Sequence, residues 1–475
     1  MPLTPNLDHD QLRLLAEEYN TPYQLYDGDL IKSHAENYMK TFKRYFPQFK
    51  QYFAVKATPN PVILKLLKDC DMGFDCSSRE EIKLVQHMDY TQSVLEFDFI
   101  NKKKSEILFT SNYTSKEDLE FALKSDCIIN LDSLDGLYKL IEITNQCDIK
   151  KLPLISFRFN PPSLNSNVNV NINVKSNDFL GTESKFGLDK NNILEGFRMA
   201  KTSGFTEFGL HIMAKSCVLD IDYWPQLMNV VFVLVSDINK IHDINLKFID
   251  IGGGIGIPYK PAEPEINLEK LVINLRKSFD ENMNKYNLTQ EPILFTECGR
   301  YITGKFGWLV AECKSIKSSH GNLFYGLDAS MANLMRPGMY EAYHHITIPE
   351  AEFRNRNNKY NIEIKGNVVG TLCENNDWFA KFRDLPTGIK PGDLFVIHDT
   401  GAHGYSMGFN YNSKLRCTEL LKLNGSTECI RNKETFDDLI RNCSTYNLAN
   451  LYIFIYVLII TGLLLDYYFF YLYVS

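Results

Sequence analysis

In this sequence no long run of basic residues stands out, and no stripe in which basic and aromatic residues are interleaved. Its 51 Lys and Arg residues are outnumbered by 58 Asp and Glu residues, so the formal net charge is −7 at pH 7. Because nucleic acids are bound largely through their phosphates, this balance argues against a nucleic-acid-binding protein. A chain of 475 residues with 44% hydrophobic residues is long enough for two or more globular domains.

Cysteine pairs with the spacing of a zinc site are missing as well. The 11 cysteines are irregularly spaced, and none of them belongs to a Cys-x-x-Cys motif. An odd number of cysteines in so long a chain is not a disulfide framework either. We therefore expect no metal site. The first 12 residues lack the charged start and apolar run of a secretory signal, which favours a cytoplasmic protein.

Only one long apolar run is present, and it lies at the C-terminus. Residues 451–474 are almost wholly apolar or aromatic, and about 20 apolar residues are the length that spans a bilayer. Asp466 lies within this run, and its carboxylate would cost roughly 2–3 kcal/mol near the membrane centre. For the hydrophobic tail at 448–475 three interpretations stay open: an atypical terminal extension, a membrane anchor, or a helix packed on the domain surface.

Within about the first 300 residues, short β-rich runs alternate with segments of helical periodicity. This alternation predicts parallel strands joined by helical crossovers. Eight such strands are the number found in a (β/α)8 barrel, and an open doubly wound sheet is the alternative. The predicted strands are Gln51–Ala57, Met72–Ser78, Glu106–Asn112, Cys127–Ser133, Pro153–Asn160, Glu207–Met213, Leu246–Gly254 and Pro292–Arg300, with helices such as Pro61–Asp69, Arg79–Gln86, Ser115–Lys124, Leu134–Asn145 and Asn191–Thr202 between them.

The pattern changes after Arg300, where strand-like runs follow one another with few helical intervals. We expect the barrel at 32–300, a mostly antiparallel β domain at 301–440, and an N-terminal segment at 1–31 that joins the β domain. Residues 165–174, in which Asn alternates with Val or Ile, are expected to form a surface insertion. The predicted strands of the β domain are Trp308–Ile316, Asn322–Leu327, Tyr360–Val369 and Asp393–His398.

The ends of the predicted barrel strands are rich in ionisable groups and glycine. Catalytic groups of a (β/α)8 barrel lie at the C-terminal ends of its strands. Lys56 follows the apolar residues 52–55, where partial desolvation would lower its pKa and make it nucleophilic, although an ordinary strand-capping lysine is the alternative. The groups at these ends are Lys56, Asp75, Ser77, Ser78, Arg158, His211, Gly252, Gly253, Gly254, Glu297 and Arg300.

The glycine-rich run Asp250–Gly256 could cradle a phosphate with its backbone amides, because glycine lets a ligand approach closely. It is not the dinucleotide motif Gly-x-Gly-x-x-Gly, since Pro258 follows before any helix. Arg300 could pair with the same phosphate. A strand-end lysine, a phosphate loop and the carboxylate of Glu297 together suggest pyridoxal phosphate, which needs a lysine to hold it and a charge partner for its ring nitrogen.

These residues are part of an ordered set of motifs that resembles the pyridoxal-phosphate decarboxylases with an alanine-racemase-like barrel, and within them the diaminopimelate decarboxylases. The resemblance extends from about Pro22 to Leu439, and so many matches in order are highly specific. The motifs are Tyr52–Ala57, Gly73–Ser78, Ser184–Leu188, Asp250–Gly256, Glu297–Arg300, Arg336–Tyr340, Leu372–Asn375 and His398–Ala402.

The resemblance implies a role for each residue of the cofactor site. Lys56 would hold the cofactor covalently and then yield it to the amine of the substrate. Glu297 would face the pyridine nitrogen and keep it protonated. The residues around the phosphate would be Ser216, Gly254, Gly299 and Arg300, and the other cofactor-binding positions would be Asp75, Met213, Gly253 and His403.

Three positions depart from the family pattern. Met213 stands where the family has a histidine that stacks on the cofactor ring, and a thioether can still pack on a ring. His403 replaces the usual tyrosine and keeps a hydrogen-bonding group. Cys298 replaces a proline and leaves both charged neighbours intact. These features indicate a divergent branch of the family.

The resemblance also implies a substrate site and a partner subunit. Cys373 would protonate the substrate carbon after CO2 leaves, reaching in from the second subunit of a homodimer, although a buried inert thiol is the alternative. Arg300, Arg336 and Tyr340 would bind a distal carboxylate, while Glu374 would bind the distal amine. His403 would also contact the substrate.

We therefore expect meso-2,6-diaminopimelate as the substrate and L-lysine as the product. Ornithine or another basic amino acid is the alternative substrate, and Arg336 would then merely pair with a neighbouring carboxylate such as Glu341. A non-catalytic regulator is disfavoured, because such a chain should have lost Lys56 or Cys373.

Overall fold

The computed structural model describes residues 5, 7–88, 106–146, 152–161, 181, 183–355, 363–443, 456–457 and 459–464. The chain divides into two compact units, Met1–Lys433 and Glu434–Ser475. The first unit contains a barrel and a large β sheet, and all the predicted site residues belong to it.

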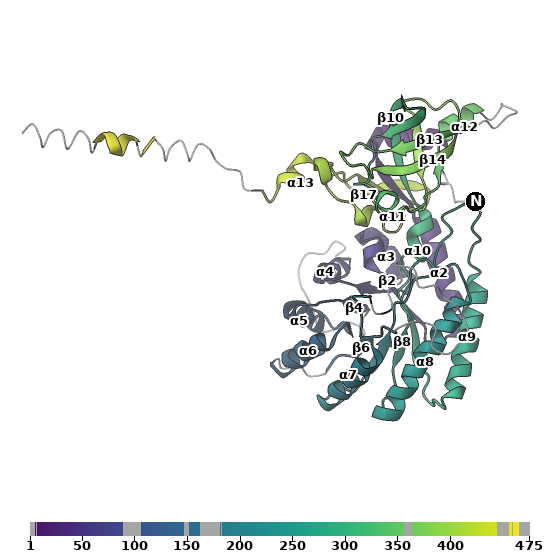
Figure 1. Cartoon of the computed structure of the whole chain (residues 1–475), viewed down its shortest axis with the longest axis vertical. Helices are drawn as coiled ribbons and strands as arrows, with labels where there is room; N and C mark the ends of the chain where they lie inside the picture. The colour runs from purple at the N-terminus through teal and green to yellow at the C-terminus, as the bar shows by residue number, and fades with distance from the viewer. Residues whose placement is uncertain are drawn as a thin grey trace, which may run out of the picture. The chain divides into compact units, whose positions relative to one another are not determined.

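Eight parallel strands close into a barrel. The predicted (β/α)8 architecture is therefore confirmed, and the alternative prediction of an open doubly wound sheet is excluded. Each strand pairs with the next in chain order, and the last pairs with the first. Figure 1 shows these strands inside a ring of helices. They are β2 (Lys50–Ala54), β3 (Gly73–Cys76), β4 (Ile107–Ser111), β5 (Ile128–Leu131), β6 (Ile155–Arg158), β7 (Phe208–His211), β8 (Phe248–Asp250) and β9 (Ile293–Thr296).

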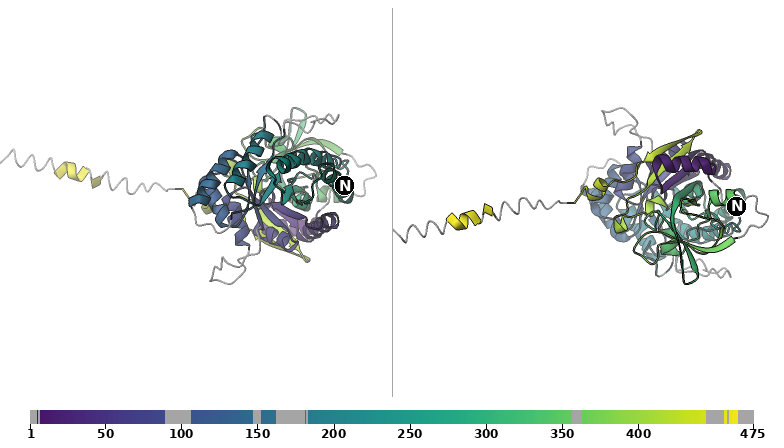
Figure 2. Two further views of the ribbon diagram at one scale, coloured as in Figure 1. Left: turned by 90° about the horizontal axis from the view of Figure 1, so that it is seen from below. Right: turned by 90° about the horizontal axis from the view of Figure 1, so that it is seen from above.

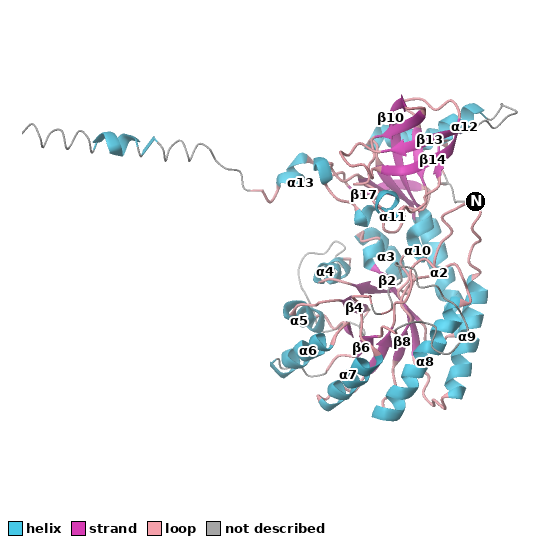
Figure 3. Ribbon diagram, in the orientation of Figure 1, coloured by secondary structure: helices cyan, strands magenta, loops and turns pink. Residues whose placement is uncertain are grey.

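The helices that surround the barrel each bury one face, and their ends are encoded locally (Figure 3). In α3 (Pro61–Asp69), Asn60 accepts a hydrogen bond from the backbone of Val62 at 3.1 Å, and a proline occupies the first turn. Both features are typical of helix N-termini. The other barrel helices are α2 (Gly28–Tyr45), α4 (Arg79–His87), α5 (Lys116–Lys124), α6 (Leu134–Gln146), α7 (Lys190–Thr202), α8 (Tyr223–His242) and α9 (Leu268–Lys285).

Large side chains fill the interior of the barrel. Phe248 stacks on Phe295 with ring centroids 4.2 Å apart. Gly209 makes room for this pair, since a Cβ at that position would lie 2.2 Å from the Phe248 ring. The interior is thus a packed core, and the C-terminal ends of the strands are left to form a site. The buried members of this core are Tyr52, Leu108, Ile128, Phe248 and Phe295.

The second part of this unit is a nine-stranded sheet. The sequence predicted a mostly antiparallel domain, which is confirmed: among the described residues only two pairs of neighbouring strands, β1 with β16 and β11 with β13, run parallel. The strands are β1 (Tyr23–Asp27), β10 (Gly307–Ser319), β11 (Asn322–Leu327), β12 (Ile346–Thr347), β13 (Glu363–Val369), β14 (Trp378–Pro386), β15 (Leu394–Ile397), β16 (Thr418–Leu423) and β17 (Ser426–Arg431), with short helices α10 (Arg300–Thr303), α11 (Arg336–Tyr340) and α12 (Pro349–Asn355).

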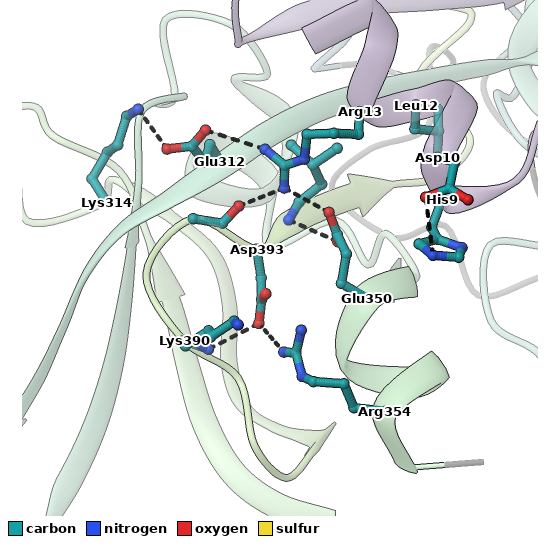
Figure 4. Close-up of polar contacts among 12 residues, drawn as sticks. His9, Asp10, Leu12, Arg13, Glu312, Lys314, Glu350, Arg354, Lys390 and Asp393 are labelled. Atoms are coloured by element: carbon teal, nitrogen blue, oxygen red, sulfur yellow. Dashed lines mark hydrogen bonds and ion pairs between the residues drawn. The ribbon is translucent and has the colours of Figure 1, made fainter. Parts of the chain in front are cut away.

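The N-terminal segment lies in this sheet and not in the barrel. β1 is placed between β10 and β16. In the right-hand view of Figure 2 the purple N-terminal segment accordingly lies next to green and yellow segments from the C-terminal half of the chain. The preceding helix α1 (His9–Tyr19) is joined to the same domain through Arg13, as Figure 4 shows. Arg13 donates to Glu350 and to the carbonyl of Gly392, both at 2.6 Å, and its other terminal nitrogen lies 3.5 Å from Glu312. One guanidinium therefore joins the N-terminal helix to three segments of the β domain.

The β domain also holds the loop that follows the first barrel strand. The carbonyl of Ala57 accepts a hydrogen bond from the backbone N–H of His403 at 2.9 Å. Thr58 donates from its hydroxyl to the carbonyl of Gly401 at 2.7 Å. These contacts fix the backbone directly after Lys56, so the two parts of the unit share the mouth of the barrel.

The second unit contains the short helix α13 (Phe436–Ile440). Within the described residues, none of the helices combines the length and the apolar character needed to cross a bilayer. Most of the hydrophobic tail at 451–474 and all of residues 165–174 lie outside the described residues. The predictions for both segments stay predictions.

Candidate active site

Lys56 lies at the mouth of the barrel, one turn beyond a strand. The predicted strand Gln51–Ala57 ends earlier, at Ala54, and Val55–Ala57 form a 3-10 turn that carries the lysine. Its Nζ lies 3.5 Å from Oδ2 of Asp75, the last residue but one of the neighbouring strand β3. About half of the Lys56 side chain is accessible, whereas Asp75 is fully buried.

The pKa of Lys56 is raised, so the prediction of a lowered pKa is wrong. Burial does lower the pKa of this amine, as the apolar strand suggested. The carboxylates of Asp75, Glu297 and Glu81 nevertheless outweigh burial, because each stabilises the ammonium form. Lys56 is therefore a charged amine that faces a group of acids.

Glu297 follows β9 and is nearly buried, with 6% of its surface exposed. Its Oε2 lies 3.3 Å from Nε2 of His211, and its Oε1 accepts a hydrogen bond from the hydroxyl of Thr110 at 3.3 Å. These partners end or lie in β7 and β4, so three strands converge on one carboxylate.

Two carboxyl groups at the barrel mouth have opposite pKa shifts. Burial and the charge of Glu297 raise the pKa of Asp75 to about 7. Burial would also raise the pKa of Glu297, but His211, Lys56 and Arg158 together hold it below its usual range. Glu297 is thus the carboxylate that stays charged, and Asp75 is a carboxyl that can carry a proton near neutral pH.

The glycine-rich run Asp250–Gly256 leaves β8 and passes between two other loops. Gly254 has a φ of +97°, and a Cβ there would lie 2.2 Å from the carbonyl oxygen of Lys215. At Gly253 a Cβ would lie 2.8 Å from the carbonyl oxygen of Glu297. Side chains are therefore excluded at both positions, and backbone amides are left to face a ligand.

The other predicted cofactor positions lie on loops around this run. Gly299 packs on the Lys56 turn, since a Cβ there would lie 2.7 Å from Cβ of Ala57. Met213 lies beside Gly252, where a Cβ would lie 2.8 Å from the Met213 sulfur. Ser216 is exposed in the loop after β7. The structure thus brings the strand ends and the glycine run together at one rim.

Arg300 and Arg336 meet at the ring of Tyr259. Arg300 donates a hydrogen bond to the Tyr259 hydroxyl, and its guanidinium carbon lies 5.7 Å from the ring centroid. The guanidinium carbon of Arg336, from α11 of the β domain, lies 5.0 Å from the same centroid. Both arrangements are within the range of cation–π contacts. A buried phenol therefore holds two like charges close together.

Neither arginine has a protein anion for a partner in the described part of the chain. No carboxylate lies within ion-pair distance of Arg300 or Arg336 there, Glu341 included, and the Nε atom of each is buried without a hydrogen-bond partner. The aromatic residues beside the two arginines carry no negative charge either. His344 packs edge-on against Tyr259, and burial and the charge of Arg336 lower the pKa of His344 to about 3, so its ring is neutral. Such a pair of unpartnered cations is suited to bind an anionic ligand.

His403 lies next to the same cations. Its pKa is lowered well below the usual range by burial and by the charges of Arg300, Arg336 and Lys56. A neutral imidazole can accept or donate a hydrogen bond without adding a further charge. His403 is thus joined by its backbone to the turn that carries Lys56, and its imidazole is within electrostatic reach of the two arginines.

Cys373, Glu374 and Tyr340 are exposed. The backbone of Cys373 donates to Asn412 at 2.8 Å, and Glu374 accepts a hydrogen bond from Asn376 in its own turn. Within the described residues, no hydrogen bond or ion pair joins Cys373 or Glu374 to Lys56. The structure thus gathers most of the predicted site in one chain and leaves these two on the surface of the β domain.

Other site residues did not follow from the sequence. Tyr259, His344 and Thr110 were not predicted, although Tyr259 follows the glycine-rich run closely enough to have been considered. His211 was noted only as a strand end. The predicted strand ends Ser77 and Ser78 instead lie at the start of α4. Ser78 is its N-cap and accepts a hydrogen bond from the backbone of Glu81 at 3.2 Å, and the backbone of Ser77 donates to the Glu81 carboxylate at 2.6 Å.

One cluster has the residue types of a metal site. His211, Asp250 and Glu297 are buried, and each offers a ligand atom within 4.8 Å of the others. Among the described residues this is the one such group. The expectation of no metal therefore stays a prediction.

A family model covers the barrel. Residues 32–304 match the pyridoxal-binding domain of the pyridoxal-dependent decarboxylases. The chain belongs to this family. Protein TabA of Pseudomonas amygdali pv. tabaci is 35% identical to this chain over 429 residues. The match covers 89% of this chain and 91% of TabA. The diaminopimelate decarboxylase of Methanothermobacter thermautotrophicus is 32% identical to this chain. The match covers 90% of this chain and 92% of that enzyme.

Solved structures agree with this assignment. The structure of the diaminopimelate decarboxylase of M. jannaschii superposes on this chain with a TM-score of 0.77 at 27% identity. The match covers 91% of this chain and 94% of the M. jannaschii chain. The Helicobacter pylori enzyme complexed with L-lysine has a TM-score of 0.76 at 29% identity, covering 90% and 98%. The decarboxylase is thus a pyridoxal-phosphate enzyme that acts on a small amino acid.

The barrel mouth fits this cofactor on its own geometry. The glycine positions form a cradle that any side chain would fill. Two buried polar atoms near it, Oδ1 of Asp75 and Nε of Arg300, have no hydrogen-bond partner among the described residues. A lysine, a charged carboxylate and an arginine surround the same space, which are the groups that an aldehyde, a pyridine nitrogen and a phosphate require.

Proposed function

We propose that this decarboxylase converts meso-2,6-diaminopimelate to L-lysine and CO2. The observation that carries the proposal is the pair of guanidiniums of Arg300 and Arg336 on the ring of Tyr259, which have no carboxylate partner among the described residues. A charged pair of this kind needs an anion from the ligand.

The distal end of the substrate decides between the candidates. Diaminopimelate carries a carboxylate and an amine there, whereas ornithine and lysine carry only an amine. An arginine matches a carboxylate through two parallel hydrogen bonds, and two arginines would repel an ammonium group. Tyr340, four residues after Arg336 on the same helix, can donate a further hydrogen bond from its hydroxyl.

The relatives support this choice of substrate. Several curated relatives that cover about 90% of the chain are named diaminopimelate decarboxylases. The name of TabA states no reaction. Structures titled as lysine or ornithine decarboxylases are 18% identical to this chain, a likeness that shows the fold alone.

Lys56 and Glu297 would serve the reacting end of the substrate. When bound, pyridoxal phosphate supplies an electron sink for the bond broken as CO2 leaves. Lys56 would hold the aldehyde of the cofactor through its amine, and Asp75, 3.5 Å away, is placed to take a proton from that ammonium. Glu297 stays ionised and would keep the pyridine nitrogen protonated.

The rim would bind the phosphate and orient the ring. The backbone at Gly253, Gly254 and Gly299 would donate to the phosphate, together with Ser216 and Arg300. Met213 would pack against the ring as an apolar group. His403 would hydrogen-bond near the phosphate as a neutral imidazole.

We also propose a homodimer in which each site is completed by the second subunit. Cys373 and Glu374 are exposed and have no hydrogen bond or ion pair to Lys56 among the described residues, although the proton donor and the amine partner must reach the substrate. The same two residues of a second copy would complete the site. Mixing Lys56→Ala and Cys373→Ala chains should then restore activity that neither variant has alone, and no restoration would contradict shared sites.

A CO2-release assay tests the substrate. We expect the purified holoenzyme to act on meso-diaminopimelate with a kcat/KM well above that for ornithine, lysine or arginine. Equal or higher kcat/KM for ornithine or lysine would refute the proposal. Borohydride reduction of the holoenzyme should fix the cofactor on Lys56, which separates a loss of cofactor from a wrong substrate.

A further inference from the structure

His211 has no role so far, although it lies at the centre of the site. It ends β7 and is fully buried. The register of the barrel sets it beside Asp250, the last residue of β8. The next strand, β9, pairs with β8 and leads into Glu297. Three ionisable side chains from adjacent strand ends thus share one buried space.

The contact between His211 and Glu297 has a defined direction. Nε2 of His211 lies 3.3 Å from Oε2 of Glu297. An ionised carboxylate can only accept, so the proton of this hydrogen bond must be on Nε2. Thr110 donates to the other oxygen of Glu297. A carboxylate has about four acceptor positions, so a further donor can still bind.

The surroundings of Glu297 make this hydrogen bond important. Asp250 is fully buried, and one of its oxygens has no partner among the described residues. Burial and the charge of Glu297 raise the pKa of Asp250 well above its usual range. Without the hydrogen bond donated by His211, the Glu297 carboxylate would lose part of the stabilisation of its charged form and could take up a proton in place of Asp250 or Asp75. The charged or titratable groups that face it are Lys56 after β2, Asp75 on β3, Arg158 on β6, His211 on β7 and Asp250 on β8.

We propose that His211 is a positioning residue whose hydrogen bond holds the Glu297 carboxylate in place for the pyridine nitrogen of the cofactor. This inference rests on the proposed function, in which Glu297 faces that nitrogen. His211 acts through Glu297 and is not itself a catalytic residue. Its role also differs from ring stacking, which belongs to the neighbouring position 213.

The test follows the ring nitrogen directly. Full-length holoenzyme is loaded with pyridoxal phosphate labelled with nitrogen-15 in the ring, and the protonation of that nitrogen is followed by NMR against pH without substrate. His211→Phe removes the donor and keeps an aromatic ring, whereas His211→Gln keeps an amide donor. Tyr38→Phe is the control, because the Tyr38 hydroxyl lies 3.1 Å from Thr296 and does not touch the Glu297 carboxylate.

In the wild type and in Tyr38→Phe we expect the ring nitrogen to stay protonated over the widest pH range. In His211→Phe the midpoint of its titration should fall by about one pH unit, the size of one hydrogen bond to a charged group. His211→Gln should recover most of this loss. A merely structural histidine would not move this signal.

Two outcomes separate this inference from the proposed function. If His211→Phe titrates like the wild type while Glu297→Gln lowers the midpoint, the inference is wrong and the role of Glu297 stands. If Glu297→Gln leaves the midpoint unchanged, the role of Glu297 itself fails. A Tyr38→Phe midpoint as low as that of His211→Phe would also overturn the inference. Should His211→Phe not fold, His211→Asn, whose amide is too short to reach Glu297, takes its place under the same criteria.

Discussion

Replacing Arg336 with alanine should damage the turnover of diaminopimelate far more than any residual turnover of lysine or ornithine. Arg336 reaches the barrel mouth from the β domain, with its guanidinium carbon 5.0 Å from the centroid of the Tyr259 ring. Only the substrate with a distal carboxylate would use this charge. The effect should therefore depend on the substrate.

The size of the effect follows from the contact that is lost. A hydrogen-bonded charge pair in a site with little water contributes about 2–4 kcal/mol, which corresponds to roughly 30- to 1000-fold in kcat/KM. Arg300 remains, with its guanidinium carbon 5.7 Å from the same ring centroid, and should limit the loss to this range. Arg336→Lys keeps the charge but not the two parallel donors, so its loss should be intermediate.

Stability measurements separate this role from a structural one. Arg336 has no carboxylate within ion-pair distance among the described residues, so its removal leaves no buried anion unpaired, and the melting temperature should change little. Arg383→Met is the matched control, because that guanidinium lies 4.0 Å from the Tyr343 ring centroid in the same domain. Equal losses of kcat/KM for all substrates, or a loss that follows a fall in melting temperature, would refute the carboxylate site.

Four further predictions concern other parts of the chain. Lys56→Ala should abolish the visible absorbance of the bound cofactor at an unchanged melting temperature, and a variant that still absorbs and turns over would exclude Lys56. Cys373→Ala should lower kcat by about 10²–10⁴-fold with little change in substrate affinity, as measured by steady-state kinetics. Arg13→Ala, which removes the cation at the centre of the network in Figure 4, should lower the free energy of unfolding by about 1–2 kcal/mol in urea titrations. Burial raises the pKa of Asp399 to about 7, and one of its oxygens has no partner among the described residues. Because the unfolded carboxyl titrates near pH 4, this group makes the protein less stable as pH rises from about 4 to 7. Asp399→Asn should therefore raise the melting temperature more at pH 8 than at pH 5.

The barrel could be predicted because its signals are local. Each barrel strand is followed by a helix, and for most of the strands the change of period from two to 3.6 is visible within about 20 residues. The β domain was predicted only in part, since β12, β14, β16 and β17 were missed. Strand β16, for example, pairs in parallel with β1 from the other end of the chain. No short window of sequence contains both partners of such a pair.

The site was predictable to the extent that it lies at strand ends. Lys56, Asp75 and Glu297 are far apart in the sequence, and the barrel rule alone brings them together. Tyr259 and His344 could not be found in this way, because their positions depend on the contact between barrel loops and the β domain. The pKa of Lys56 was predicted in the wrong direction for a related reason: the sequence shows the apolar strand before it, but not the carboxylates on the facing strands.

The departures from the family pattern are compatible with activity because they leave the distribution of charge unchanged. The acids lie at or next to the ends of β3, β8 and β9, where the proposed site would offer a carboxylate to the pyridine nitrogen. The cations Arg300 and Arg336 lie at the rim, where they would face the phosphate and the substrate carboxylate of the proposed function. His403 stands among these cations and is kept neutral by burial and by their charges. Its imidazole therefore stands in place of a phenol without adding a third positive charge. The thioether of Met213 is neutral as well. Both substitutions thus change the shape and the hydrogen bonding of the site, but they leave unchanged the arrangement of charges on which the proposed chemistry depends.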